Sequence, residues 1–385
     1  MESPRPLPAL TNDLLEEIFL RIGSPGDLVR ASAASVNFRR LITDPSFLRR
    51  YRSLHPPLLF GLIDADGGGF QPAEAPHPSA ALGRAVAGAA DFSFEDYLPR
   101  GIGGYHYLLD VQGGRVLLTY HAEEEEKKKL LPHLAVCDPL ARRCLLLPPI
   151  HEDRFASVDV QNRCIDAFLV PSGDEEDDTS FRVITRMICP EMVVAFIFSS
   201  ATGHWSAGPS VSWDALTERL WLRPPSYLYS CFYWKVYGKN KWLKFDMSSM
   251  EFSADEMIED GHDGGETIIA EAGEGRVGMF RLNIDDASLC YTIIRQIAGT
   301  RFDQLKMDNM IPLLVGYWYH SVHGPYEGHI FIRGFRLPTL AENACFTLEI
   351  KTLKIERVCQ MRLGNVKPYF GFPPFMSPIR PFDLF

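Results

Sequence analysis

Residues 136–149 read VCDPLARRCLLLPP, and this short stretch contains the unit from which most of the chain is built. An apolar run ends at Asp138, a few turn-forming residues follow, and a second apolar run begins at Cys144. Asp suits the junction because its carboxylate can accept hydrogen bonds from the backbone of its own turn. The stretch therefore predicts a β-hairpin with two short strands.

The same form recurs along the chain as a strand, an acidic or serine residue, a tight turn and a second strand. The other copies are LLDVQGGRVLL (108–118), FIFSSATGHWS (196–206), WLKFDMSSMEFS (242–253), RLNIDDASLCYTI (281–293) and FTLEIKTLKIERV (346–358). Their turn residues are Asp110, Ser200, Asp246, Asp285 and Glu349.

The spacing of these hairpins indicates the architecture. The six copies span about 239 residues, which gives an average spacing of about 48 residues, within the range of propeller blades. So many short strands in an open sheet would leave long unpaired edges, whereas radial repetition leaves only short ones. We therefore expect an all-β propeller-like domain of about six blades, with five to seven compatible. A pair of β-sandwiches is the alternative architecture.

The first 55 residues have a helical period instead. Leu14, Leu15 and Ile18 lie at helical spacing, Gly23 ends the run, and Ser24 with Pro25 begins another helix. Phe38 belongs to a third apolar stripe, and a short helix is expected from Asp44-Pro45 onward. We expect a small three-helix module, which would be marginally stable without a partner.

Charge marks a boundary near residue 55. Residues 1–55 hold eight Arg and six acidic residues, whereas the whole chain has a net charge of -10. The expected organisation is an α+β multidomain chain, with a helical module at 1–55 and a propeller-like domain at 56–385. Prolines are dense from about residue 368, which suggests an extended C-terminal tail.

Both parts resemble plant F-box proteins. Residues 7–55, LPALTNDLLEEIFLRIGSPGDLVRASAASVNFRRLITDPSFLRRYRSLH, are similar to an F-box, and CDPLARRCLLLPP, YSCFYWKV, MEFS, IIAEAGEGRVGMF and LEIKTLKIERVC resemble the F-box-associated propeller domain. The resemblance implies that the helices dock on a Skp-type adaptor and through it on a cullin. The contact residues it implies are Leu7, Pro8, Leu14, Leu15, Ile18, Leu28 and Phe38. Phe38 departs from the family, which usually has Trp at this position.

The expected function is substrate recruitment in an SCF-type cullin ubiquitin ligase, without catalysis, in the cytoplasm or nucleus. The client protein cannot be identified from the sequence. Three alternatives remain open. The chain could be a propeller enzyme or sugar-binding lectin with a helical extension, or an F-box protein that binds without ligase activity. A helical cap on the β domain would also explain the apolar residues of the first 55.

Composition and missing motifs exclude other classes. A net charge of -10 and a pI near 5.6 argue against a nucleic-acid partner, and no apolar run is long enough for a membrane span. The eight cysteines form no CxxC pair, which favours buried thiols over a metal site. The common hydrolase and nucleotide-binding signatures are absent. We expect no catalytic residues, cofactor or metal.

Three stretches could carry recognition. Residues 123–129 and 172–179 are charged loops that could bind a partner or be plain insertions. Residues 221–234 are rich in aromatic side chains, including Tyr227, Tyr233 and Trp234. Alternation within that stretch fits a strand, so these rings could pack in the core or line a central channel.

Overall fold

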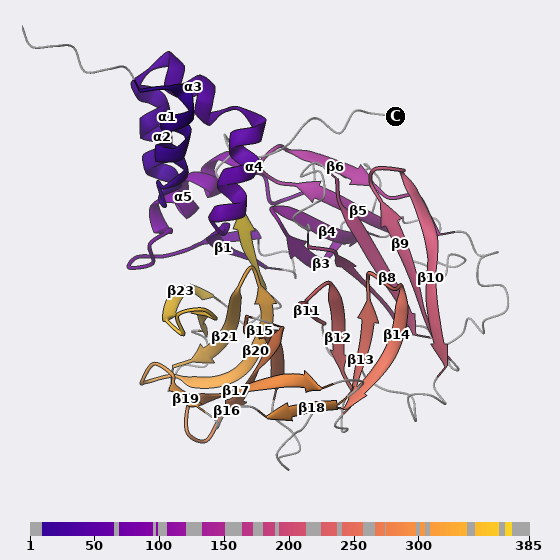
Figure 1. Cartoon of the computed structure of the whole chain (residues 1–385). Helices are drawn as coiled ribbons and strands as arrows, with labels where there is room; N and C mark the ends of the chain where they lie inside the picture. Colours follow the sequence, from indigo (N-terminus) through magenta and orange to yellow (C-terminus); the bar gives the residue numbers. More distant parts are fainter. Residues whose placement is uncertain are drawn as a thin grey trace, which may run out of the picture.

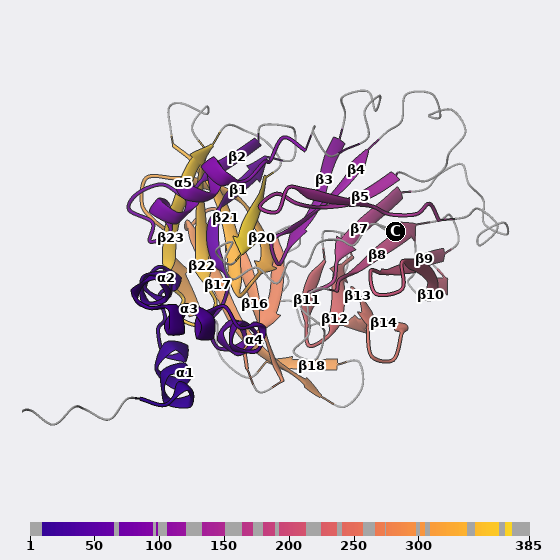
Figure 2. The same ribbon diagram turned by 90° about the horizontal axis from the view of Figure 1, so that it is seen from above.

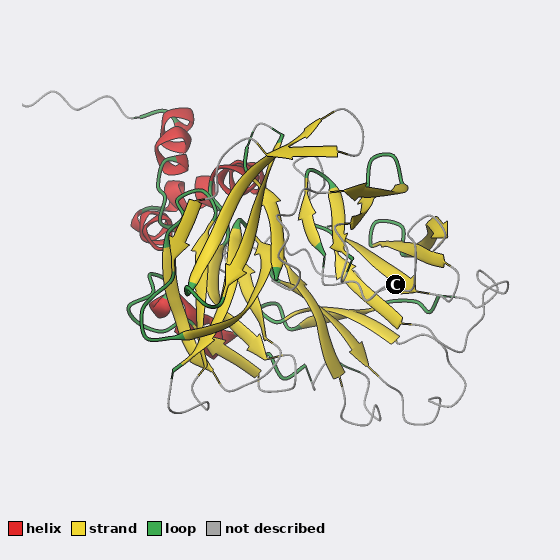
Figure 3. Cartoon of the chain, turned by 90° about the horizontal axis from the view of Figure 1, so that it is seen from below, coloured by secondary structure: helices red, strands yellow, loops and turns green. Residues whose placement is uncertain are grey.

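The protein is described from a computed structural model. The described residues are 10–64, 69–94, 98, 106–120, 133–150, 164–171, 180–188, 192–212, 225–236, 241–256, 266–273, 275–297, 301–304, 309–336, 343–361 and 366–371. A helical module lies to one side of a ring of β-sheets (Figure 1; Figure 3). None of the helices in these ranges is long and apolar enough to span a bilayer.

The helical module has four helices where the sequence predicted three. They are α1 (Asn12–Leu20), α2 (Pro25–Ala34), α3 (Val36–Ile42) and α4 (Pro45–Leu54). Ser35 separates α2 from α3, because its backbone is extended and its side chain accepts a hydrogen bond from Phe38 N at 3.1 Å. A single capping serine thus marks the boundary between the second and third apolar stripes of the sequence.

The strands of the remaining described chain form five hydrogen-bonded sheets, which make up the six blades of a β-propeller. Blade 1 contains β1 (Leu58–Asp64), β2 (Gly69–Pro72) and β24 (Val366–Gly371). Blade 2 contains β3 (His106–Gln112), β4 (Arg115–Tyr120), β5 (His133–Asp138) and β6 (Arg143–Leu146). Blade 3 contains β7 (Cys164–Leu169), β8 (Arg182–Ile188), β9 (Met192–Ser199) and β10 (His204–Ser212).

Blades 4 and 5 are joined at their outer edges by one parallel bridge, from Glu256 to Arg301. Blade 4 contains β11 (Ser226–Leu228), β12 (Cys231–Lys235), β13 (Lys241–Asp246) and β14 (Glu251–Glu256). Blade 5 contains β15 (Thr267–Glu271), β16 (Arg276–Asn283), β17 (Ser288–Ile297), β18 (Arg301–Gln304) and β19 (Asn309–Pro312). Blade 6 contains β20 (Trp318–Tyr326), β21 (His329–Phe335), β22 (Asn343–Glu349) and β23 (Ile355–Met361).

The ring closes by pairing the two ends of the propeller segment. In blade 1, β24 is antiparallel to β1, with Leu58 opposite Gly371 and Asp64 opposite Val366. The six blades surround an axis that is lined by β3, β7, β11, β15, β20 and β24 (Figure 1; Figure 2). The expected six-bladed propeller is confirmed, and the alternative of paired sandwiches is wrong.

Apolar cores lie between neighbouring blades. Along β4, Val116 and Leu118 belong to the core between blades 1 and 2, while Leu117 belongs to the core between blades 2 and 3. This alternation is what a period of two residues produces in a strand buried on both faces. Each of the six junctions between blades has such a cluster.

Two sequence expectations for the propeller domain are wrong. The helical period does not end at residue 55, because α5 (Ala80–Ala89) packs on β1 and β2. The proline-rich segment does not become a tail at 368, because Pro368 lies within β24, opposite Leu62. Small residues fill α5, so it shows no stripe of large apolar side chains. Pro368 is tolerated since β24 pairs with β1 alone.

Candidate functional site

The helical module exposes a row of apolar side chains along α1. Leu14 and Ile18 are one turn apart and are 53% and 47% exposed, and Leu10, just before the helix, is 54% exposed. We call these three residues the α1 face. Residues four apart share one side of a helix, so Leu14 and Ile18 form one continuous surface. A contiguous exposed apolar surface of this kind is typical of a protein-binding site.

Other residues predicted to contact the adaptor belong to the core of the module. Leu28 is fully buried and Leu15 nearly so, in a cluster with Phe19, Ile42 and Phe47. Their assignment as direct contact residues is corrected, because their side chains stabilise the fold that presents the α1 face.

The aromatic position and the first two predicted contacts have different outcomes. Phe38 is half-buried, and its ring meets that of Phe19 edge-on with centroids 5.1 Å apart. One side of the Phe38 ring therefore supports the core while part of it remains accessible. Leu7 and Pro8 lie outside the described residues.

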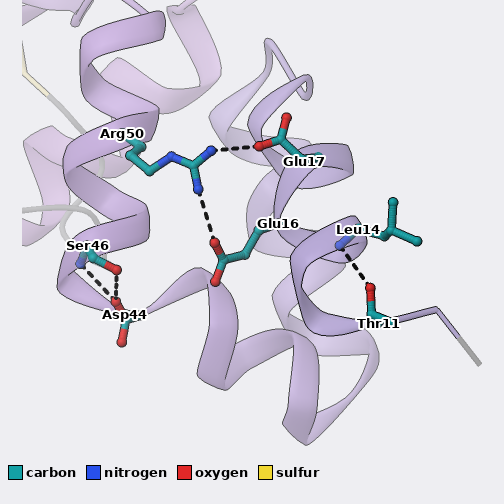
Figure 4. A network of polar contacts seen from close by, with 7 residues as sticks. All are labelled: Thr11, Leu14, Glu16, Glu17, Asp44, Ser46 and Arg50. Carbon is teal, nitrogen blue, oxygen red and sulfur yellow. Dashed lines mark hydrogen bonds and ion pairs between the residues drawn. The ribbon is translucent and has the colours of Figure 1, made fainter.

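Polar contacts brace the module on the side away from the α1 face. Arg50 on α4 reaches Glu16 at 3.2 Å and Glu17 at 2.6 Å, both on α1 (Figure 4). Thr11 caps α1 by accepting a hydrogen bond from Leu14 N at 3.4 Å. In Figure 4 the Leu14 side chain points away from Arg50. Exposed ion pairs of this kind each contribute at most about 1 kcal/mol, so their role is to fix the angle between α1 and α4.

The tyrosine of α4 ties the helices together from inside. The Tyr51 hydroxyl donates to the carbonyl of Ile22 at 2.7 Å, and Tyr51 is fully buried. Burial raises the pKa of Tyr51 to about 12, so the phenol stays protonated and keeps donating this bond. The apolar core and this internal hydrogen bond of the module are therefore formed by residues of the module itself.

The second candidate site is the central channel of the propeller. It contains a cavity of about 720 Å³ whose walls come from the innermost strands of all six blades. Pro56 and Pro57, which join α4 to β1, lie at the same cavity. A cavity of this size, with an aromatic side and several ionisable groups, fits a ligand pocket.

Glu327 is placed in the channel by an unusual turn. Tyr326 pairs with His329, so β20 and β21 are joined by a two-residue turn made of Glu327 and Gly328. Their φ angles are +45° and +77°, as in the left-handed turns whose first position normally holds Asn, Asp or Gly. Gln112 donates its amide to the Glu327 carboxylate from across the ring. Burial raises the pKa of Glu327, opposed by a hydrogen bond from the Gly113 backbone.

Lys367 is the basic residue on the innermost strand of blade 1. Its ammonium lies 5.7 Å from the centre of the Tyr326 ring and 3.4 Å from that hydroxyl. Burial by itself lowers the pKa of Lys367, but Tyr326, Asp110 and Asp166 more than offset this, and the net shift is upward. Burial raises the pKa of Asp110, which Lys367 opposes. Lys367 is thus a cation already balanced from within the protein.

One side of the channel is aromatic. The rings of Tyr227 and Phe232 are 4.8 Å apart, and Phe168 lies 6.4 Å from Phe232. The predicted aromatic stretch therefore divides, because Tyr227 lines the channel while Tyr233 and Trp234 pack between blades. Phe232 is 3% exposed and belongs to the core between blades 3 and 4, at the edge of the cavity. Both interpretations of that stretch are correct, for different residues.

Two other sites were considered from the sequence, the charged segments and a metal site. The charged segments 123–129 and 172–179 lie outside the described residues. Within the part of the chain that the structure describes, no group of three or more His, Cys, Asp or Glu side chains is placed to hold a metal ion.

Sequence reasoning missed the channel residues. Asp110 was interpreted as a turn residue, although it lies within β3 and the turn is made by Gly113 and Gly114, with φ angles of +56° and +78°. Lys367 and Glu327 carried no motif, since their neighbours come from other blades. The one local signal was Glu327-Gly328 between two apolar strands, which is the pattern of a tight hairpin turn.

Comparison with known proteins finds only distant resemblances to solved structures. No family profile matches the chain, and no curated protein matches it. Solved structures that resemble it include YCF48 from Cyanidioschyzon merolae, at 9% identity and a TM-score of 0.36, over 66% of this chain and 69% of that one. An oligogalacturonate lyase in complex with manganese is 10% identical, with a TM-score of 0.36, over 66% of this chain and 65% of the lyase.

A prolyl endopeptidase structure is also similar, at 10% identity and a TM-score of 0.36. It is matched over 80% of this chain and 60% of its own length. The chain thus spans less than two thirds of the lyase and of the endopeptidase. At these identities neither activity is transferred to it.

Proposed function

We propose that this chain is a non-catalytic, substrate-recruiting subunit of an SCF-type cullin ubiquitin ligase. In this proposal the helical module binds a Skp-type adaptor, and the propeller binds a client protein. The α1 face is the observation that carries it, because Leu10, Leu14 and Ile18 are exposed although the module already has a closed core. The resemblance of residues 7–55 to an F-box supplies the identity of the partner.

The two-part structure suits recruitment by proximity. A client held by the propeller and an adaptor held by the helices are kept at a fixed separation by a short linker at Pro56-Pro57. Such tethering raises the effective concentration of the client near the ubiquitin donor without any chemistry in this chain. The chain's own contribution is therefore two binding surfaces and the rigid propeller between them.

Adaptor binding tests the proposal directly. Leu14→Ala with Ile18→Ala removes two exposed apolar anchors, and co-purification of the full chain with a Skp-type adaptor should fall at least about tenfold. Leu54→Ala is the matched control, since Leu54 is 61% exposed on α4 of the same module but lies off the α1 face. It should leave adaptor capture unchanged.

Circular dichroism of both variants should match that of the parent chain, because none of the three leucine or isoleucine side chains is buried. If the double variant captures the adaptor as well as the parent chain does, the α1 face is not the adaptor site. If the parent chain captures no Skp-type adaptor, the proposed function itself is wrong.

A further inference from the structure

We infer that the central channel binds a positively charged side chain, lysine or arginine, presented by an extended segment of the client. This inference deepens the proposed function and rests on it, because it names the chemistry by which the propeller would select a client. The observations that carry it are the cavity, the charges facing it, its aromatic wall and the contact that holds the Glu327 carboxylate.

The charges at the cavity favour a cationic ligand. Four carboxyl groups line it, against two ammonium groups and one imidazole: Asp110, Glu271, Glu327 and Glu349 against Lys351, Lys367 and His329. The imidazole of His329 interacts with the carbonyl of Glu327 at 2.9 Å. Lys367 is balanced by Asp110 and Tyr326, so it is not free to hold an anionic ligand. With Lys367 and Asp110 set against each other, the three carboxyl groups of Glu271, Glu327 and Glu349 remain against Lys351 and His329.

The aromatic wall suits the same ligand. Phe168 and Tyr227 offer apolar surface for the methylene stem of a long basic side chain and ring faces for its charge, and the buried Phe232 packs against both rings. The protein already uses this interaction nearby, because the Arg186 guanidinium lies 5.8 Å from the Phe168 ring and 4.9 Å from the Trp234 ring. In a partly enclosed cavity, charge attraction is stronger than at an open surface.

Glu327 occupies a tight turn and is held there by Gln112. Glu327 has a φ of +45°, and other non-glycine turn residues of the propeller, such as Met250 and Leu353, also have positive φ angles. Asn or Asp would fit the turn better, but their shorter side chains would not extend as far from it. Gln112 holds the carboxylate in place before any ligand arrives, which lowers the entropy lost on binding.

The test uses the full chain and four synthetic pentapeptides, acetyl-Gly-Ser-X-Ser-Gly-amide, in which X is lysine, arginine, norleucine or glutamate. Isothermal titration calorimetry at low ionic strength should show the lysine and arginine peptides binding at least about tenfold more tightly than norleucine. The glutamate peptide should bind most weakly. The adaptor is absent from this assay, so the result does not depend on the α1 face.

Variants locate the binding. Glu327→Gln combined with Glu349→Gln should weaken lysine and arginine binding at least about tenfold and leave norleucine unchanged. Glu251→Gln is the matched control, because it removes the same charge from an exposed position on the outer strand β14. Circular dichroism confirms that each variant is folded.

Several results would overturn the inference. These are equal binding of norleucine and lysine peptides, preference for the glutamate peptide, no binding of the basic peptides at millimolar concentration, or an unaffected double glutamine variant. A chain that binds basic peptides but captures no adaptor would keep this channel assignment and reject the ligase role. A chain that captures the adaptor but does not bind the basic peptides would reject the channel assignment and keep the ligase role.

Discussion

Leu14 and Leu15 are adjacent and chemically identical, yet one faces solvent and the other packs in the core of the helical module. Leu14 is 53% exposed and Leu15 is 7% exposed. The helical period of the sequence identified both as apolar positions but could not separate them, because α1 has more apolar residues than one core-facing stripe needs. Only the packing of α3 and α4 against α1 decides which of the two is left for a partner.

The buried and exposed leucines should respond differently to truncation. Leu28→Ala leaves a cavity in the closed core and should destabilise the module by about 2–5 kcal/mol, whereas Leu14→Ala should cost less than about 0.5 kcal/mol. Hydrogen exchange of the α1 to α4 amides in the full chain measures both. Equal exchange rates in the two variants would contradict the burial difference.

Glu327 should make stability depend on pH. Burial raises its pKa, so the folded chain holds this proton more tightly than the unfolded chain does. Its contribution to the free energy of unfolding is therefore largest below the ordinary carboxyl pKa and falls as pH rises toward the folded-state pKa. Glu327→Gln keeps an oxygen to accept from Gln112 but cannot ionise, so it should raise the melting temperature at neutral pH.

That gain should disappear in acid, below the ordinary carboxyl pKa, where the parent carboxyl is protonated in both states. Thermal unfolding followed across this pH range gives the comparison, with Glu251→Gln as the exposed control. A variant less stable than the parent chain at neutral pH would show that the carboxylate stabilises the fold. The buried Glu327 carboxylate would then be explained by stability alone, without a bound ligand.

The hairpins show which features of an element can be predicted from its sequence. Asp138 and Asp246 do cap their turns, and Asp246 accepts from Ser248 N at 2.9 Å and Ser249 N at 3.2 Å. In the copy around Asp285, the acceptor is Asn283 instead, at 3.2 Å and 3.4 Å. The sequence therefore predicted that these turns form, but it identified the capping side chain correctly at Asp138 and Asp246 and not at Asp110 or Asp285. The channel role of Asp110 depends on Lys367, more than 250 positions away, and has no local signal.

Helix α5 was missed because small residues hold it against the sheet. A Cβ at Gly83 would lie 2.2 Å from the carbonyl oxygen of Phe60 on β1, whereas one at Gly88 would meet nothing within 4 Å. The backbones of α5 and β1 therefore approach each other closely at Gly83, where a side chain would not fit, and not at Gly88. The sequence signal for this contact is only the glycine itself.

These two glycines form a matched pair for a test. Gly83→Ala should destabilise the propeller by about 1–3 kcal/mol through overpacking. Gly88→Ala should stabilise it by about 0.4–1 kcal/mol, because alanine restricts the unfolded chain and favours the helix. Chemical denaturation of the two variants gives both values. If Gly83→Ala is neutral, α5 does not pack on β1 as described.

At the scale of the whole molecule, the number of blades was predictable and the way the ring closes was not. The average hairpin spacing indicated about six blades, although the predicted hairpins around Asp110 and Asp138 both lie in blade 2 and none of the predicted copies lies in blade 1. Closure requires β24 to pair with β1, across about 300 positions of sequence. The prolines near 368 made that segment unlike a strand in the sequence. The channel depends on closure, because its walls come from six blades that are distant in sequence.

The two parts of the chain should separate cleanly. None of the described residues before Pro56 belongs to an apolar cluster of the propeller, and the cluster of the helical module contains no propeller residue. A fragment of residues 56–385 should therefore fold alone, with the β-sheet circular dichroism of the full chain and a melting transition within a few degrees of it. It should bind the lysine pentapeptide with unchanged affinity and capture no Skp-type adaptor.

The full chain carrying Leu14→Ala and Ile18→Ala is its matched control, since it should behave in the same way with the helices still present. An unfolded fragment would mean that the helices contribute to the propeller's stability through contacts beyond the apolar clusters. A folded fragment that still captures the adaptor would place the adaptor site on the propeller and leave the α1 face without a role.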